Sequence, residues 1–274
     1  NGLQTTNVIY EIYKQDKEKL VGVYVMIRLY ETNDTELVDK ITDATNTQSP
    51  INYRDKISNK KFNEFTKAIF ENAGVGYLQK RGDTFENKMS IEMGDFISSE
   101  IVLKFWYASF YEKPEFAKSS KSKVLEDLFD ATTNEENKLY QLFSGDKDSP
   151  VYKQLLSVYK LYKIIVSQRE AKIIDKYDFV DYADELFAYG IYRLLDQNQS
   201  LNLIDDNSTI LQAYEEIFKK INTNVINEKD KKVTQEQTYS HNSYFKSAKC
   251  RIDLNECLNW SERENIANYL KSLP

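Results

Sequence analysis

The chain has 274 residues, of which 41% are hydrophobic and 29% charged, and its net charge is −6. This balance is typical of a soluble globular protein of about two domains with a sizeable core, and it excludes an overall basic surface for nucleic acid. No apolar run is long enough to span a membrane, and the two cysteines, Cys250 and Cys257, are typical of a reducing compartment, so we expect a cytoplasmic protein without a membrane contact.

The chain begins with a polar turn over residues 1–6, followed by a predicted helix over residues 6–15. Gly2 can adopt backbone angles that other residues avoid, and Thr5 or Thr6 can cap the helix. A glycine turn that opens a helix points free N–H groups outward, as in many phosphate sites. An ordinary capped helix start is the alternative interpretation.

The next elements are predicted from hydrophobic periodicity. Residues 21–29 alternate with a period of two and predict a strand. A second helix then leads to another polar turn, residues 45–50, where Pro50 ends the pattern. A third helix stops at Gly74, and residues 76–85 predict a short strand or a hairpin around Gly82-Asp83.

From Gly94 onward the pattern is almost wholly helical. We therefore predict an α+β fold that is predominantly α, with a small α/β unit over residues 1–90 and a helical domain over residues 91–225. Residues 226–274 are expected to form a polar linker and C-terminal helices that pack on the helical domain. The helices expected are Asp95–Tyr111, one opening at Pro114, one through Leu139 and Phe143 that ends at Gly145, one after Ser149-Pro150, 178–197, 208–225, 244–258, and one from a capping box of Ser261 and Glu264.

Several short motifs resemble one family when they are read together. They are N-G-L-Q-T-T at residues 1–6, I-T-D-A-T-N-T-Q-S-P-I at 41–51, Q-K-R-G at 79–82 and K-P-E-F-A at 113–117. In this order they resemble the AIPR family of bacterial proteins, named for abortive infection and phage resistance. The similarity extends over about residues 1–145 and is weak or absent beyond. In the family the first motif lies well inside the chain, so the resemblance implies a C-terminal portion whose upstream domain is a partner.

The order of the first elements is also similar to the nucleotide-binding core of the ParB/sulfiredoxin-like group. This resemblance implies that two turns hold a nucleotide's phosphates, with Gly2 as the first glycine and Asn46 as the asparagine of the second turn. Gln4, Thr5 and Ser49 stand where that group has arginines. Amides and hydroxyls carry no charge, so the positive charge must come from elsewhere, with Arg54, Lys80 and Arg81 as candidates.

The ligand expected is a nucleotide or a nucleic-acid phosphate, while a modified base, or no ligand, stays open. The predicted binding residues are Asn1, Gly2, Gln4, Thr5, Asn46, Gln48, Lys80 and Arg81. The helical part is expected to relay occupancy to the upstream domain or to another subunit. The competing hypotheses are a non-catalytic scaffold for protein–protein interaction and, with least support, a nucleotide hydrolase.

No catalytic or metal-ligating residue can be assigned from the sequence. His241 is the only histidine, which excludes a histidine triad or a two-histidine metal site within this chain. His241, Cys250 and Cys257 fit no common zinc spacing. The tyrosines at 152, 159 and 162 have helical spacing and are expected in the core rather than as a base-stacking surface. The basic stretch Lys118, Lys121 and Lys123 is expected to be a solvated loop.

Overall fold

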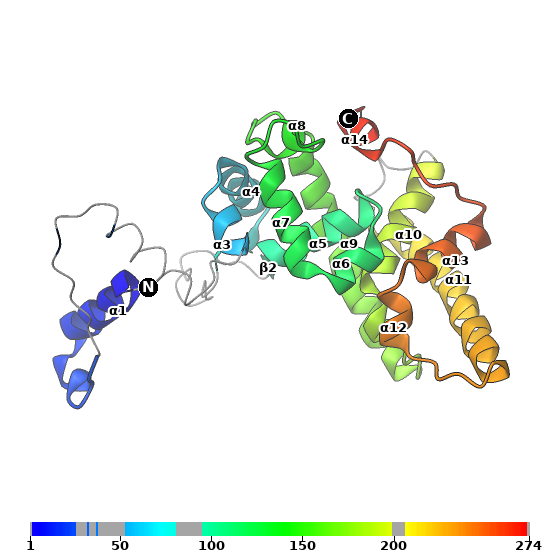
Figure 1. The fold of residues 1–274 in the computed structure, drawn as a ribbon, viewed down its shortest axis with the longest axis horizontal. Helices are drawn as coiled ribbons and strands as arrows, with labels where there is room; N and C mark the ends of the chain where they lie inside the picture. Colours follow the sequence, from blue (N-terminus) through cyan, green and yellow to red (C-terminus); the bar gives the residue numbers. More distant parts are fainter. Residues whose placement is uncertain are drawn as a thin grey trace. The chain divides into compact units, whose positions relative to one another are not determined.

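The computed structural model describes residues 2–25, 32, 37, 53–80, 95–198 and 206–272. Its contacts divide the chain into two units, Asn1–Ile51 and Asn52–Pro274, each of which is described by itself. Figure 1 shows the helices and strands of both units.

The first unit opens with helix α1, Gly2–Gln15, followed by a short 3-10 helix, η1, Lys17–Leu20. The predicted turn before the helix is therefore wrong over residues 2–5, which form the first turn of α1. Because α1 begins at Gly2, Thr5 and Thr6 lie inside the helix and not at its cap position. The capping contact in this region belongs to η1: its N-cap residue, Asp16, accepts a hydrogen bond from the Glu18 amide at 3.1 Å.

The strand predicted over residues 21–29 is wrong over residues 21–25. Gly22 has a φ of +84°, and the Val23 amide donates to the Leu20 carbonyl at 3.0 Å, so the chain turns where the alternating pattern predicted an extended backbone. Residues 26–29 lie outside the described part. Leu37 is helical, as predicted, while the rest of that helix and the second polar turn also lie outside it.

The second unit is mostly helical with a small parallel sheet, which confirms the predicted fold class. Its helices are α3 Tyr53–Ser58, α4 Lys61–Asn72, α5 Ser99–Ser109, α6 Pro114–Ser119, α7 Lys121–Ala131, α8 Tyr140–Phe143, α9 Val151–Ile174, the 3-10 helix η3 Val180–Tyr182, α10 Asp184–Gln197, α11 Asn207–Thr234, α12 His241–Phe245, α13 Ala248–Leu258 and α14 Ile266–Ser272.

The sheet consists of β1, Val75–Leu78, and β2, Asp95–Ser98, which pair in parallel. The strand predicted near Gly76 is confirmed, whereas the helix predicted from Asp95 begins only at Ser99. Gly76 lies opposite Phe96, and a Cβ at Gly76 would overlap that ring, so glycine is required for the close pairing. The hairpin position at Gly82-Asp83 lies outside the described residues.

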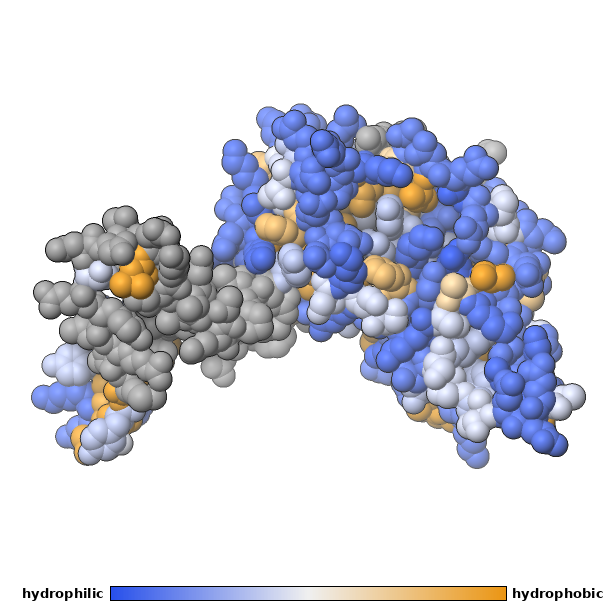
Figure 2. Space-filling model, in the orientation of Figure 1, coloured by the Kyte–Doolittle hydropathy of each residue, from blue (hydrophilic) through white to orange (hydrophobic). Residues whose placement is uncertain are grey.

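The core of this unit is built around α5, α9 and α10. Trp106 of α5 is fully buried, and its indole nitrogen donates to the Gln154 side chain of α9 at 2.9 Å. Tyr152 and Tyr159 of α9 are 3% and 7% exposed, which confirms that the tyrosine stripe belongs to the core. Figure 2 shows that the visible face of this unit is mostly hydrophilic, with small separate apolar spots. No helix in the described part of the chain has the length and apolar character needed to cross a membrane.

The C-terminal segment differs from its predicted organisation. The expected polar linker begins as helix, because α11 continues to Thr234 and buries Glu228 on the side that contacts α13. One predicted helix over 244–258 is two helices, α12 and α13. The predicted capping box at Ser261 is also wrong, since α14 begins at Ile266 and the preceding segment is held by side chains of α10.

Candidate functional site

The predicted site residues fall in different parts of the chain. Gly2, Gln4 and Thr5 lie in the first turn of α1, where backbone N–H groups have no partner within the helix. Lys80 is exposed and follows β1 in the second unit. Asn1, Asn46, Gln48 and Arg81 lie outside the described residues. The convergence of these residues on one cleft therefore stays a prediction.

Lys80 lies near an edge of the sheet with the features of an anion site. Because β1 and β2 are parallel, both carboxyl ends are at this edge, and α5 begins there at Ser99. Ser98 caps α5 by accepting from the Ile101 amide at 3.3 Å. Ligands of parallel sheets bind outside the carboxyl ends of the strands, and helix N-termini attract anions.

Arg54 of α3 brings a second cation to the same edge. Its Nη2 donates to the carbonyls of Leu78 and Lys80 at 3.3 and 3.2 Å. The side-chain amide of Gln79 donates to the Ser58 carbonyl of α3, and the Ser99 hydroxyl donates to the backbone carbonyl of Gln79 at 3.2 Å. The backbone that carries Lys80 is thus held by α3 on one side and by α5 on the other.

The three lysines predicted to lie in a solvated loop lie in helices instead. Lys118 of α6 is 3.5 Å from Glu185, and Lys121 at the start of α7 pairs with Glu100 in the first turn of α5. Lys123 pairs with a carboxylate of its own helix at 2.9 Å. The loop prediction is wrong, because all three lysines belong to helices and each pairs with a carboxylate. The Lys121 pair also offsets the one acidic side chain in the first turn of α5.

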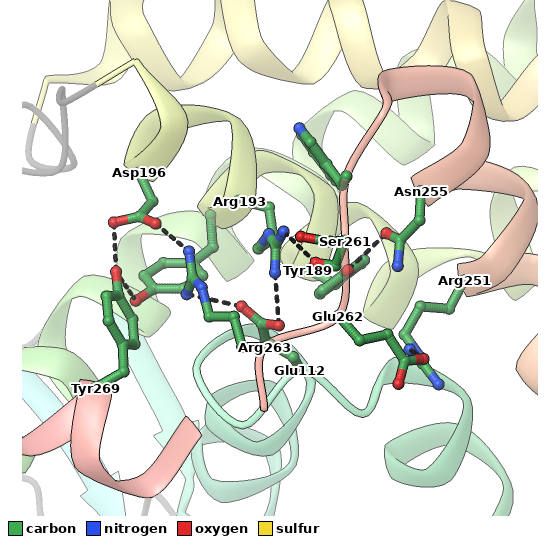
Figure 3. A network of polar contacts seen from close by, with 12 residues as sticks. Glu112, Tyr189, Arg193, Asp196, Arg251, Asn255, Ser261, Glu262, Arg263 and Tyr269 are labelled. Atoms are coloured by element: carbon green, nitrogen blue, oxygen red, sulfur yellow. Dashed lines mark hydrogen bonds and ion pairs between the residues drawn. The ribbon is translucent and has the colours of Figure 1, made fainter. Parts of the chain in front are cut away.

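A buried ion-pair network fastens the C-terminal segment to α10 (Figure 3). Arg193 of α10 donates to Glu112 at 2.7 Å and to the Ser261 carbonyl at 3.0 Å. Arg263 pairs with the same Glu112 at 2.7 Å and with Asp196. Glu112 and Arg193 are each only 7% exposed. Two arginines therefore balance two carboxylates, and no charge in this set is left over for a ligand.

Further contacts extend the network to the last two helices (Figure 3). The Tyr269 hydroxyl of α14 donates to Asp196. The Tyr189 hydroxyl of α10 donates to Asn255 of α13 at 2.6 Å, and Arg251 of α13 pairs with Glu115 at 3.1 Å and with Glu262. The two tyrosine contacts and the Arg251–Glu115 pair join the C-terminal segment to the helical body, while the Arg251–Glu262 pair joins α13 to the stretch that follows it.

Two features of Glu112, its backbone conformation and the burial of its carboxylate, are energetically unfavourable. Its φ of 58° lies in the left-handed region, which costs a residue with a side chain about 1–2 kcal/mol. Burial raises the pKa of its carboxyl, and the two arginines offset only part of that increase. The shared ion pairs with Arg193 and Arg263 explain why the fold tolerates this position.

A second buried charge cluster lies at the start of α10. Glu185 is 4% exposed, with Lys104 at 2.7 Å and Lys118 at 3.5 Å, while Asp184 pairs with Arg169 at 2.5 Å. Burial raises the pKa of Asp184 to about 6. Burial acts in the same direction on Glu185, but the two lysines outweigh it and leave the pKa of Glu185 lowered. Asp184 and Glu185 lie in the first turn of α10, where carboxylates interact favourably with the helix dipole.

The histidine and the two cysteines lie in separate contacts. His241 Nε2 is 3.2 Å from Asp178, and its Nδ1 is 3.0 Å from the Tyr239 hydroxyl. Cys250 is buried, whereas Cys257 is exposed on α13. Among the residues that the structure describes, no three side chains of the metal-ligating types gather at one point.

No pattern in the sequence predicts the ion-pair network. Arg193 and Glu112 are 81 residues apart in the chain, and Arg263 and Asp196 are 67 apart. No local spacing connects such pairs. The one available signal was the arginine inside the otherwise apolar face of α10, since a buried arginine requires carboxylate partners.

These features define a mostly helical protein whose buried charges are paired and whose small parallel sheet has a cationic edge. The family model described as AIPR protein matches residues 1–255, and the chain therefore belongs to the AIPR family, named for abortive infection and phage resistance. The match extends well beyond the 145 residues expected from the motifs, and nothing supports the similarity to the ParB/sulfiredoxin-like group. No curated protein and no solved structure matches the chain.

Proposed function

We propose that this AIPR protein acts in phage defence by binding a nucleotide or a nucleic-acid phosphate and relaying occupancy to a partner domain or to another subunit. The observation that carries the proposal is the carboxyl edge of the β1–β2 pair. There Lys80 and Arg54 lie near the start of α5, and this edge combines positive side chains with a helix N-terminus.

The chemistry of this edge favours a phosphate over a neutral ligand. A phosphate can accept hydrogen bonds from the first-turn amides of α5 and pair with the Lys80 ammonium. Arg54 already donates to two carbonyls, so its main contribution is a fixed positive charge that also orients the Lys80 backbone.

The wider proposed site adds the polar residues of the first unit. Asn1, Gly2, Gln4 and Thr5 would supply amide and hydroxyl groups, Asn46 and Gln48 would do the same from the second polar turn, and Arg81 would add a third cation. These residues complete the set that the sequence predicts for the site.

Thermal unfolding of the whole chain tests this proposal. The chain is heated with a panel of nucleotides and with DNA, each with magnesium, and is compared with Lys80→Ala and Asn46→Ala. A ligand at 100 times its Kd stabilises by about 2.7 kcal/mol, which corresponds to an increase in Tm of about 5–10 °C.

We expect this increase to shrink in both variants and to persist in Lys147→Ala, which removes an exposed lysine elsewhere in the chain. If no ligand raises the Tm, or if both variants respond like the unchanged protein, the phosphate site is refuted.

The alternative function is a scaffold for protein–protein interaction. The observation that favours it is the surface of α1, where Val8, Tyr10 and Tyr13 are more than half exposed at 59%, 54% and 59%. Light scattering after size-exclusion chromatography separates the two functions. A scaffold that self-associates through α1 gives a dimer or larger assembly that Tyr10→Asp dissociates, with no change in Tm from any nucleotide.

A further inference from the structure

A cleft lined by polar side chains lies between α11 and α13, two helices that contact each other. Its volume is about 420 Å³, within the range of pockets for small molecules. The lining side chains recur once or twice per turn on each helix. They are Asn224, Asn227, Glu228 and Lys231 of α11, and Lys249, Asp253, Glu256 and Cys257 of α13.

Asn224 in this lining has an incomplete set of hydrogen bonds. It is only 6% exposed, and its Oδ1 accepts from the Cys257 thiol at 3.0 Å. That contact fixes the orientation of the amide group. Nδ2 is buried and has no hydrogen-bond partner among the residues that the structure describes. A buried donor without an acceptor is costly and rare, so an acceptor from a ligand would stabilise this position.

Glu228 lies one helical turn after Asn224 on the same face of α11. It is 7% exposed, and it lines both this cleft and a neighbouring cavity of about 240 Å³. Lys249 is 3.4 Å from its carboxylate, but that ammonium is closer to Asp253, at 3.0 Å. The Glu228 carboxylate thus has capacity to accept further hydrogen bonds from a ligand in the cleft.

We propose that this cleft binds a small ligand with an amide-type edge, in which an acceptor oxygen lies beside N–H donors. The Asn224 Nδ2 donates to the oxygen, and the Glu228 carboxylate accepts from the N–H groups. Residues four apart on a helix are about 5–6 Å apart at Cβ, so the two groups can contact one planar edge.

Guanine and simple carboxamides share this edge. Guanine fits best, because its two neighbouring N–H donors match the two oxygens of a carboxylate. Lys231 and Lys249 line the same cleft and can pair with the phosphate of a guanine nucleotide. This ligand site uses none of the residues of the sheet edge and is independent of the phosphate site proposed there.

Cys257 provides a probe of occupancy. It is exposed and lines the cleft, whereas Cys250 is 1% exposed, so a thiol reagent modifies Cys257 selectively. The rate of Cys257 alkylation is measured by mass spectrometry on the whole chain. The probes are guanosine, GMP, nicotinamide and caffeine, a purine that carries acceptors without an N–H donor.

We expect guanosine and GMP to slow alkylation severalfold, nicotinamide to do so at higher concentration, and caffeine to have no effect. If nicotinamide protects and guanosine does not, the ligand is a carboxamide rather than a base. Equal protection by caffeine and guanosine, or no protection by any probe, overturns the proposal without requiring a variant.

Glu228→Gln is the second test, because it keeps the size of the side chain and removes the charge. We expect about a tenfold or greater loss of guanosine affinity by calorimetry, as for a hydrogen bond to a charged group. Glu216→Gln, an exposed position on the same helix outside the cleft, is the matched control and should bind normally. Unchanged affinity in Glu228→Gln also overturns the proposal.

Discussion

Replacing Glu112 by glutamine removes the charge that two arginines share. Arg263 keeps Asp196 as a partner, but Arg193 loses its carboxylate contact and keeps the Ser261 carbonyl and the face of Trp260. Removing one partner of a buried ion pair costs about 3–5 kcal/mol. Since one arginine retains a carboxylate, we expect a loss near the lower end, about 3 kcal/mol. For a chain of this size that lowers Tm by about 6–12 °C.

The backbone of Glu112 allows the ion pairs to be separated from the strain. Both Glu112→Ala and Glu112→Gly remove the carboxylate, but only glycine adopts a φ of 58° without cost. We therefore expect the glycine variant to be more stable than the alanine variant by about 1–2 kcal/mol. In a regular helix the order is reversed, because alanine is the better helix former.

Urea unfolding followed by circular dichroism measures both effects. Glu135→Gln, at an exposed turn position, serves as the control and should change stability by less than about 0.5 kcal/mol. If Glu112→Gln lowers the free energy of unfolding by less than about 1 kcal/mol, the network does not hold the C-terminal segment in place. An alanine variant as stable as the glycine variant would refute the strain at this position.

Three further predictions concern protonation and packing. Burial raises the pKa of Asp184 from 3.8 to about 6, so the folded state holds this proton more tightly, and stability falls by about 3 kcal/mol as pH rises from about 4 to 6. Urea unfolding at both pH values should show that the stability of the unchanged protein relative to Asp184→Asn falls by this amount. Burial lowers the pKa of His241, so its contribution to stability is present above about pH 6.5 and is lost on acidification. NMR titration of this single imidazole should have a midpoint below 6.5, and a higher midpoint would contradict the assignment. A Cβ at Gly190 would lie 2.8 Å from Ile217, so Gly190→Ala should cost about 1–3 kcal/mol in thermal unfolding, and a neutral result would show that α10 and α11 can separate freely.

The agreement between sequence and structure was best where the chain's local signals were strong. Proline at the first turn located α6, and Gly74, with a φ of +76°, ended α4 as predicted. Helical spacing of Tyr152 and Tyr159 correctly assigned them to the core. The AIPR motifs identified the family but underestimated how much of the chain belongs to it.

Prediction and structure differ where the local sequence fits two conformations almost equally well. Asp95–Ser98 is apolar enough for either a helix or a strand, and pairing with β1 decided for the strand. Residues 226–234 are polar, which favours a linker, yet contact with α13 keeps them helical. The Ser261 capping box lost to a competing contact, because Arg193 holds that segment in another conformation.

The sequence by itself determined the helical character, the family and a few helix ends, such as those at Pro114 and Gly74, because these depend on neighbours within a turn or two. Only the tertiary structure decided which charges are paired and which polar groups line a cleft. Arg193 meets Glu112, and Asn224 meets Cys257, across distances along the chain that no local pattern encodes. Such pairs form only when whole helices pack together, and a polar group buried by that packing is costly unless it has a partner.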